Sequence, residues 1–458
     1  MSFFSKYKNV LLLLISSILY FIFAYFLERT DFNKLLFLWF SLFCCFYFLI
    51  KSKTLQISTL IGLVVLFRLI FLFAIPNLSQ DFYRFIWDGR MLLEGFNPYL
   101  SLPKTFIEQG KQPIFDAYNL YAGMGEMNGS HYTNYPPINQ LCFLIAALFA
   151  SKSLLGSIIV LRLIIILADI GILYFGKKIL ERINLPVKNI FLYALNPFII
   201  IEMTGNLHFE PVMLFFLVFS LYKLQQQKWI WAAILLACSI SVKLIPLLFL
   251  PLFFQWFVKN KSVTKWIPAS VEMTKLMGFY SIIIATTILL FLPFYSSEFI
   301  DNYTNSVGLW FRNFEFNASF YYIFREIGYL FRGYNEIAII GKIMPFLTIV
   351  FLIIITFYRK NKSMIELITA LLFGLCFYYF TATTVHPWYL ATPLILCVFT
   401  KYRFPIIWTI VIIFSYQAYS NIPWTENLYF VALEYTILYG FIIFELLKKP
   451  KNFNIENS

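Results

Sequence analysis

Long apolar stretches separated by short polar segments run through the whole sequence. Three of them carry no charge over 19, 22 and 34 residues, at positions 9–27, 276–297 and 367–400. Because a helix needs about 20 apolar residues to cross a bilayer, the first two predict one membrane-spanning helix each and the third predicts two. The alternation typical of a membrane β-barrel is absent. The sequence therefore predicts an all-α polytopic membrane protein, the remaining way for a backbone to span hydrocarbon.

The apolar pattern also predicts where the spans lie. In chain order they are residues 9–27, 35–50, 54–75, 137–150, 155–176, 188–203, 209–223, 229–258, 275–295, 336–358, 363–384, 386–400, 404–421 and 427–447. Two long polar interruptions, residues 76–136 and 296–335, separate them and are predicted to be outer loops. Since no internal repeat or separate soluble segment is evident, we expect residues 1–458 to form one integral membrane domain.

Composition and charge agree with this class. Hydrophobic residues make up 60% of the chain and charged residues 13%, which excludes an ordinary soluble protein. The net charge of +13 raises the question of nucleic-acid binding, but the basic residues form short clusters between spans, as cytoplasmic loops do. These clusters are residues 51–53, 259–265, 359–362, 401–403 and 448–451. We therefore predict a multi-pass cell-membrane protein with both termini in the cytoplasm and both long loops outside.

The number of crossings in the middle of the chain stays open. If every basic cluster is cytoplasmic, an even number of spans must separate residues 51–53 from 259–265. Residues 229–258 form either one crossing or two crossings broken at Lys243 and Pro246, and in the second case the number is even if residues 137–176 cross only once. One count places the basic segment 177–188 outside, and the other places it inside with residues 205–211 outside.

The first outer loop contains a strongly patterned helix. A helix beginning at Asp81 gathers one apolar face, made of Phe82, Phe85, Ile86, Gly89, Leu92 and Leu93. Asp81, Arg84 and Asp88 share another face, so we expect the helix to lie on the membrane surface with its apolar side down. Asp81 suits either a helix N-cap or a functional carboxylate, and both interpretations stay open. Asp88 favours a solvated position paired with Arg84 or Arg90.

Two further places could carry chemistry. His386 is the one group expected to titrate near neutral pH within a 34-residue apolar run. It suits a helix end, with Trp388 and Tyr389 as interface anchors or as aromatic surfaces for a sugar ring. Lys243 lies about 20 Å from either end of its apolar stretch, which is too far for its side chain to reach water easily. A buried anionic partner such as a lipid phosphate would offset the cost of burying its charge.

The remaining polar residues favour structural interpretations. Arg162 and Asp169 lie seven residues apart in one span and are expected to pair with each other. His208 and Glu210 lie between two spans and are interpreted as loop residues. The second outer loop contains three cations suited to lipid headgroups, namely Arg312, Arg325 and Arg332. The sequence contains no P-loop and no GxGxxG motif.

Residues 81–99 resemble the first-loop motif D-x-Y-R-Y-x-W-[DE]-G-R…G-x-N-P-Y of GT-C glycosyltransferases. The matching positions are Asp81, Tyr83, Arg84, Trp87, Asp88, Gly89, Arg90, Gly95, Asn97, Pro98 and Tyr99. The likeness is closest to the polyprenyl-phosphate-mannose-dependent α-mannosyltransferases of bacterial envelopes and their GPI-mannosyltransferase relatives. Weaker matches follow at residues 135–137, 195–211, 241–251 and 386–390. The resemblance extends from about residue 60 onward, and residues 1–50 look like an added hairpin.

The resemblance implies a GT-C-type bundle of about 12 to 14 transmembrane helices with amphipathic helices in the first outer loop. It implies an inverting hexosyltransferase that moves mannose from a polyprenyl phosphate to a glycan or glycolipid acceptor, with Asp81 as the general base. The implied donor-phosphate residues are Lys243, Arg84 and Arg312, and the implied sugar-binding residues are His386, Trp388, Tyr389, Asp88 and Tyr135. Many relatives have an acidic pair where this chain has Gln80 and Asp81, so no metal and no cofactor are expected.

Two other function classes compete with this expectation. A transporter or flippase of a lipid-linked saccharide would use Lys243 and Arg162 along its pathway, although such proteins usually show inverted repeats. A structural scaffold of an envelope-synthesis complex would show activity only with a partner. Two long loops on one side favour the enzyme.

Overall fold

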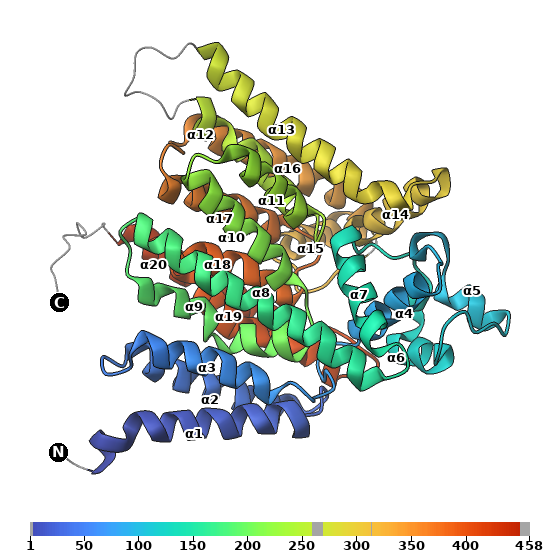
Figure 1. Ribbon diagram of the computed structural model, residues 1–458, viewed down its shortest axis with the longest axis horizontal. Coiled ribbons are helices and arrows are strands. Elements are labelled where there is room, and N and C mark those ends of the chain that lie inside the picture. The colour runs from blue at the N-terminus through green and yellow to red at the C-terminus, as the bar shows by residue number, and fades with distance from the viewer. Residues whose placement is uncertain (1–2, 259–268, 313, 449–458) are drawn as a thin grey trace.

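The computed structural model of the protein describes residues 3–258, 269–312 and 314–448, and the side chains of 7–258, 272–308 and 314–448 (Figure 1). Within these ranges the chain is helical and contains no strand, only an isolated bridge between Phe316 and Thr384. The elements are α1 (Phe3–Phe26), α2 (Phe32–Lys51), α3 (Ile57–Ile70), α4 (Asp81–Leu93), η1 (Pro98–Leu100), α5 (Pro103–Glu108), α6 (Ala117–Gly129), α7 (Pro137–Ala150), α8 (Leu154–Arg182), η2 (Val187–Ile190), α9 (Phe191–Ala194), η3 (Ile199–Gly205), α10 (Glu210–Gln225), α11 (Trp229–Ile240), η4 (Ile245–Phe253), α12 (Phe254–Val258), α13 (Ala269–Phe291), η5 (Leu292–Phe294), α14 (Ser297–Arg312), α15 (Phe320–Arg332), α16 (Ile337–Tyr358), α17 (Met364–Thr381), η6 (Pro387–Leu390), α18 (Ala391–Val398), α19 (Phe404–Val411), η7 (Ile412–Ser420) and α20 (Leu428–Leu447).

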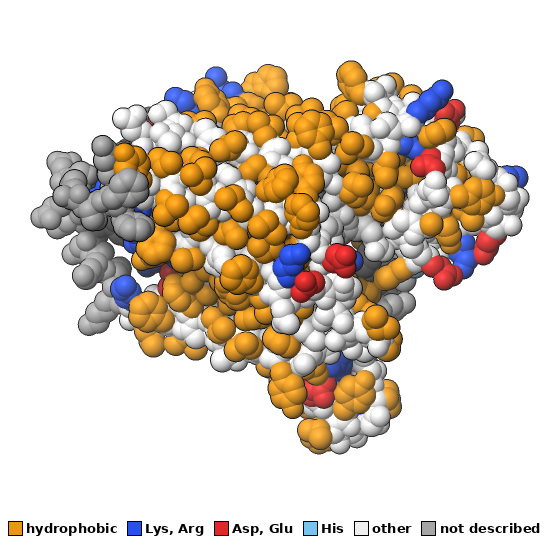
Figure 2. All heavy atoms as spheres, turned by 90° about the horizontal axis from the view of Figure 1, so that it is seen from below, with side chains coloured by type: hydrophobic (Ala, Val, Ile, Leu, Met, Phe, Trp, Pro, Cys, Tyr) orange, Lys and Arg blue, Asp and Glu red, His pale blue; other side chains and the backbone are white. Residues whose placement is uncertain are grey.

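Seven helices of the described chain are long and apolar enough to cross a membrane, namely α1, α2, α8, α13, α16, α17 and α20. The pair η3 and α10, bent by 112°, counts as an eighth if it forms one span, and six shorter apolar helices accompany them. Hydrophobic side chains cover most of the face in Figure 2, and the charged ones there gather in a few places. The predicted class, an all-α polytopic membrane protein, is confirmed.

Residues 229–258 are broken into two helical segments, which is one of the two possibilities that the sequence leaves open. Helix α11 ends at Ile240 and η4 begins at Ile245, so Lys243 lies between two helical segments. The ammonium group of Lys188 donates to the backbone carbonyl of Ser52, which places the basic segment 177–188 beside the cluster 51–53. Of the two counts, the structure therefore favours the one that keeps these two basic segments on the same side.

The helices of the two long loops gather at one end of the bundle. Figure 1 shows α4, α5, α6 and α14 together at this end, whereas the start of α1 and the end of α20 lie at the opposite end. The backbone N–H of Arg403 donates to the Glu445 carboxylate near the end of α20, so the basic cluster 401–403 also lies near the C-terminus. Polar loop helices and basic loops thus occupy opposite ends of the molecule.

Helix α4 begins at Asp81, as the sequence predicts, but the expectation that it lies on the membrane surface is wrong. Its polar face is covered by protein, and Arg84 and Asp88 are both buried. The Arg84 guanidinium donates to the backbone carbonyls of Asn128 and His131, which follow 44 and 47 residues later. Protein carbonyls therefore take the place that water was expected to fill.

The apolar face of α4 packs closely on α7, and one glycine allows this. A Cβ at Gly89 would lie 2.2 Å from the backbone carbonyl oxygen of Phe143. The Phe85 ring stacks on the Phe143 ring with centroids 4.7 Å apart, one turn of α4 away. Helix α4 therefore rests directly on the backbone of α7, which fixes its height and tilt.

A buried ion pair joins α3 to α8, and it differs from the pair that the sequence suggests. Asp169 accepts a hydrogen bond from Nε of Arg68 at 2.8 Å and another from the Tyr193 hydroxyl at 3.0 Å. Arg162 instead donates to the carbonyls of Thr204 and Gly205. The predicted Arg162–Asp169 pair is wrong because two helical turns separate the two side chains and each has a nearer partner on another helix.

Candidate functional site

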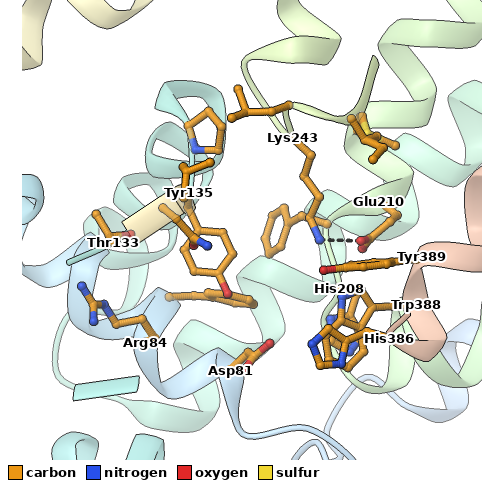
Figure 3. Close-up of a pocket in the computed structure, with 18 of the residues that line it drawn as sticks. Asp81, Arg84, Thr133, Tyr135, His208, Glu210, Lys243, His386, Trp388 and Tyr389 are labelled. Atoms are coloured by element: carbon orange, nitrogen blue, oxygen red, sulfur yellow. Dashed lines mark hydrogen bonds and ion pairs between the residues drawn. The ribbon is translucent and has the colours of Figure 1, made fainter. Parts of the chain in front are cut away.

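A cavity of about 260 Å³ lies at the end of the bundle where the loop helices gather. The start of α4, the segment before α7, the start of α10, the break after α11, helix α14 and the segment around η6 all border it. Among the residues that line it are Asp81, Arg84, Asn128, Tyr135, His208, Glu210, Lys243, His386, Trp388 and Tyr389. Figure 3 shows Asp81 and Lys243 reaching into this space from different sides.

Asp81 occupies the first position of α4, and its side chain does not cap the helix. The N-cap position belongs to Gln80, and the Asp81 carboxylate accepts a long hydrogen bond of 3.4 Å from the Asn128 amide. Burial raises the pKa of the Asp81 carboxyl above its ordinary value, although Lys243, Asn128 and Arg29 each act to lower it. A carboxylate with a raised pKa and little hydrogen bonding is suited to accept a proton.

Lys243 reaches the cavity because the helix is interrupted around it. Residues 241–244 lie between α11 and η4, and Pro246 cannot donate a backbone hydrogen bond within the next turn. The Lys243 ammonium group forms an ion pair with Glu210 at the start of α10, which also lines the cavity. The second carboxylate oxygen of Glu210 is buried without a hydrogen-bond partner among the described residues. The lysine therefore points into the cavity and not along its helix toward water.

Three stacked rings form one wall of the cavity. The Trp388 ring lies between the rings of His208 and His386, with centroid separations of 4.0 Å and 4.4 Å and interplanar angles of 19° and 6°. The Tyr389 ring stands at 89° to that of His386. Because both faces of Trp388 are covered by imidazole rings, the stack borders the cavity with its edge, where ring nitrogens can form hydrogen bonds to hydroxyl groups of a sugar.

The other predicted site residues lie in different positions. Tyr135 and Arg84 line the cavity, but the Arg84 guanidinium already donates to Asp88 at 2.8 Å and to two carbonyls. Asp88 is fully buried behind Arg84 and accepts a second hydrogen bond from Gln140, so the predicted solvated position is wrong. It is not among the residues that line the cavity. The Arg312 side chain lies outside the described side chains.

The sequence interpretation missed four cavity neighbours. The sequence places Glu210 and His208 in a loop, and no local pattern marks Asn128. Arg29 lies in the turn between α1 and α2, with its guanidinium carbon 3.3 Å from the centre of the Tyr419 ring. Its positive charge lowers the pKa of the Asp81 carboxyl. A signal was present, since residues 205–211 place two ionisable side chains in an apolar region, where such groups are costly unless they are used.

Two buried polar atoms at the aromatic wall, one on His208 and one on Glu202, have no hydrogen-bond partner among the described residues. Nε2 of His208 lies 3.8 Å from a Glu202 carboxylate oxygen, too far for a hydrogen bond, and neither atom has a partner within the described chain. The Tyr416 hydroxyl donates to the other Glu202 oxygen at 2.7 Å. Within the same described residues, no group of three or more His, Cys, Asp or Glu side chains could hold a metal ion.

Comparison with known proteins agrees with the motif in the first loop. The family model described as "Alpha-(1->6)-mannopyranosyltransferase, N-terminal domain" matches residues 23–259, just over half of the 458-residue chain. No curated protein matches the chain significantly. The matched segment contains Asp81, Glu210 and Lys243, and its start lies within α1. The chain is therefore a membrane-embedded mannosyltransferase of the GT-C type and belongs to the α-(1→6)-mannopyranosyltransferase family.

Proposed function

We propose that this mannosyltransferase takes its sugar from a polyprenyl-phosphate donor and transfers it, with inversion at the anomeric carbon, to a glycan or glycolipid acceptor. The observation that carries the proposal is the cavity in which a carboxylate, Asp81, and an ammonium group, Lys243, approach from different sides. An inverting transfer needs a base near the attacking hydroxyl and positive charge near the departing phosphate.

Asp81 is proposed as the general base. Its carboxylate would accept the proton of the acceptor hydroxyl while that oxygen bonds to the anomeric carbon and the bond from this carbon to the phosphate oxygen breaks. Because burial raises its pKa, Asp81 is a stronger base than an exposed aspartate. Within the described chain its carboxylate accepts one long hydrogen bond, from Asn128, and borders the cavity.

Lys243 is proposed to stabilise the departing phosphate. A lipid-phosphate sugar is a phosphodiester with one negative charge, and its departure leaves a phosphomonoester that carries additional charge. An ammonium group in a partly buried site stabilises that developing charge better than one in water would. The ion pair with Glu210 holds Lys243 in place beforehand, and the phosphate would join this pair or replace the carboxylate.

The aromatic wall is proposed to hold the mannose. The imidazole rings of His208 and His386 cover both faces of Trp388, so the edge of this stack borders the space for the sugar, and Tyr389 and Tyr135 lie beside it. The sequence has neither a P-loop nor a GxGxxG motif for a nucleotide diphosphate, which supports a lipid-linked donor. An active site on the outer membrane face, with cytoplasmic termini, is supported by the gathering of basic loops at the opposite end of the bundle.

Donor choice can be tested with the purified protein in detergent micelles. The protein would be given radiolabelled mannose on a polyprenyl phosphate or on a nucleotide diphosphate, together with a mannoside acceptor. We expect label in the acceptor from the lipid donor alone, and no sealed compartment should be needed. Transfer from the nucleotide donor, or a requirement for intact vesicles, would contradict the proposal.

A further inference from the structure

A buried glutamate lies behind the aromatic wall of the catalytic cavity. Glu202 is the middle residue of η3, is 0% exposed and is not among the residues that line the cavity. His208, six residues later, does line the cavity and stacks on Trp388 (Figure 3). Glu202 can therefore act on a substrate only through a residue of the wall, and His208 is the one beside it.

Glu202 and His208 each turn one polar atom toward the other. The distance from Nε2 of His208 to Oε2 of Glu202 is 3.8 Å, and both atoms are buried without a hydrogen-bond partner in the described chain. Buried polar atoms without a partner are rare, because they give up their hydrogen bonds to water. The separation is about 0.9 Å longer than that of a usual N–H···O hydrogen bond. A small rotation of the two side chains would therefore close this contact into a hydrogen bond.

The other oxygen of Glu202 is held in place by a tyrosine. The Tyr416 hydroxyl donates to it at 2.7 Å, and Tyr416 is itself buried. A hydroxyl donor stabilises the ionised form of a carboxylate more than the neutral acid. Oε2 of Glu202 is then a charged acceptor, and the hydrogen atom that suits it is one on Nε2 of His208.

This arrangement selects one form of the His208 ring. A neutral imidazole carries its proton on one nitrogen and accepts a hydrogen bond with the other. With the proton on Nε2, facing Glu202, the second nitrogen Nδ1 becomes an acceptor. Because the ring lines the cavity and Nε2 is its buried nitrogen, Nδ1 is the nitrogen left for a hydroxyl group in the cavity.

The backbone around the pair is strained and firmly held. The wide turns of η3 are those of a π-helix, a rare conformation that is frequent at functional sites. Leu207 has a φ of 61°, in the left-handed region that residues other than glycine seldom adopt. Arg162 donates to two backbone carbonyls of the same segment. Strained backbone persists where the surrounding structure enforces it, and here it places His208 beside Glu202.

We propose that Glu202 is a positioning residue for mannosyl transfer, which holds the proton of His208 on Nε2 so that Nδ1 accepts a hydrogen bond from a sugar hydroxyl group. The contact of 3.8 Å shortens when the sugar binds, since hydrogen bonds in a site without substrate are often long and tighten in the complex. Each hydrogen bond in such a chain polarises the next one. The inference rests on the sugar site proposed above and holds for any type of donor.

Nitrogen NMR tests the form of the ring without any substrate. The chain has three histidines, so isotope-labelled histidine gives few signals, and substitution of each histidine in turn assigns them. Protonated and unprotonated ring nitrogens have distinct chemical shifts. We expect the proton of His208 on Nε2 in the full-length protein in micelles, and a loss of this preference in Glu202→Gln. A proton mainly on Nδ1 in the unaltered protein would overturn the inference, even if Glu202→Gln fails to fold.

A matched pair of substitutions tests the same role by kinetics. Glu202→Gln keeps the shape of the side chain and removes its charge. The sugar contact is the same before and during the reaction, so KM for the donor should rise about tenfold while kcat stays within about twofold. Glu434→Gln is the control, because Glu434 is also 0% exposed, has one oxygen without a partner in the described chain and does not line the cavity. An unchanged KM in Glu202→Gln, or an equal effect of both variants, would overturn the inference.

A second background shows whether Glu202 acts through His208. His208→Phe keeps a ring against Trp388 and removes both ring nitrogens. Two residues that act through one contact have effects that do not add. Glu202→Gln should therefore raise KM no further in a protein that already has His208→Phe. Additive effects would place the action of Glu202 elsewhere and overturn the inference.

The two proposals can fail separately. The form of the ring is measured without a donor, so a lack of transfer from polyprenyl phosphate would overturn the proposed donor and retain the pair of Glu202 and His208. Transfer from the lipid donor, with the proton of His208 on Nδ1, would overturn the pair and retain the proposed function.

Discussion

Two of the groups of buried charges in the described chain differ in how completely protein atoms satisfy their carboxylates. In the first, Arg68 and Asp169 form an ion pair with both side chains at most 1% exposed, and Tyr193 donates to the second carboxylate oxygen. In the second, Asp81 has one long hydrogen bond of 3.4 Å, and Glu210 has an oxygen without a partner in the described chain. Both groups lie among apolar helices, but only the second borders a cavity.

This difference indicates that Arg68 and Asp169 hold helices together, whereas Asp81 and Glu210 are able to interact with a ligand. Burying a charge is costly. The structural pair offsets much of this cost, because both oxygens of Asp169 and two nitrogens of Arg68 are hydrogen-bonded, while Nη2 of Arg68 has no partner among the described residues. A group that stays incompletely bonded beside a cavity gains its partners when substrate binds. The comparison predicts that similar substitutions in the two groups have opposite effects on activity and stability.

The largest effect is expected from Asp81→Asn. Asparagine has nearly the same shape but cannot accept the proton, so mannose transfer should fall by up to about 10⁴-fold. The midpoint of thermal unfolding should change little, because the Asp81 carboxylate accepts a single long hydrogen bond from the described residues. Transfer of radiolabelled mannose and thermal unfolding in detergent measure the two quantities. Asp301→Asn, on an exposed position of α14, is the matched control. Near-normal transfer by Asp81→Asn would exclude this residue as the base.

The reverse result is expected from Asp169→Asn. This change leaves the Arg68 cation buried without its anion and should lower the free energy of unfolding by about 3 to 5 kcal/mol. Protein that stays folded should retain most of its kcat, since Asp169 is not among the residues lining the cavity. The double variant Arg68→Met, Asp169→Leu should be more stable than either single variant. A stable Asp169→Asn protein that transfers no mannose would remove the distinction between the two groups.

Lys243→Met should have a smaller effect on activity. Loss of the ammonium group removes one source of stabilisation of the departing phosphate, which should lower kcat/KM by about 10²-fold. Glu210 loses its ion-pair partner at the same time, so the double variant Lys243→Met, Glu210→Gln serves as the control for stability. Full activity of Lys243→Met would show that another cation serves the phosphate.

The same variant should also shift the pH dependence of the reaction. Lys243 lowers the pKa of the Asp81 carboxyl, so its removal should raise that pKa further above the ordinary value. The base acts when deprotonated, and activity therefore rises as pH increases through this pKa. The acidic limb of the kcat/KM profile should move to higher pH in Lys243→Met, and a shift to lower pH would contradict this electrostatic arrangement.

The smallest effect is expected from Trp388→Ala. Aromatic pairs contribute about 0.5 to 1.5 kcal/mol beyond the area they bury, so loss of the stack should raise KM for the donor about tenfold or less. Trp388→Phe keeps a ring between His208 and His386 and should recover most of the loss. Equal KM values in both variants would show that the sugar does not use this wall.

Much of the helical architecture could be predicted because lipid demands long apolar stretches. Residues 137–150 were predicted as a span and form α7 with the same bounds, and α4 begins at the predicted Asp81. The environment of α4 could not be predicted in the same way. An amphipathic pattern fits a helix on lipid and a helix whose polar face is covered by protein, and the carbonyls that cover Arg84 come from more than 40 residues away.

In the candidate site, too, residues with a local sequence signal could be predicted, and residues that depend on long-range contacts could not. Asp81, Lys243 and the segment 386–390 stand out locally, because a charge or histidine in an apolar region is conspicuous. Glu210 did not stand out, since its importance depends on the break at Lys243 that brings the two together. Asp169 was paired with the wrong arginine because its partner, Arg68, lies 101 residues earlier in the chain. Contacts between distant segments leave no trace in local spacing.

The close packing of α4 on α7 has a consequence for how the enzyme can be inactivated from a distance. Asp81 is the first residue of α4 and Gly89 is the ninth, so the two lie about 12 Å apart along the helix axis. Even a single methyl group at position 89 would clash with the Phe143 carbonyl oxygen. Helix α4 would then have to move away from α7. This movement would displace the Asp81 carboxylate from its position in the cavity. A small apolar substitution outside the substrate site would then abolish catalysis in a protein that still folds.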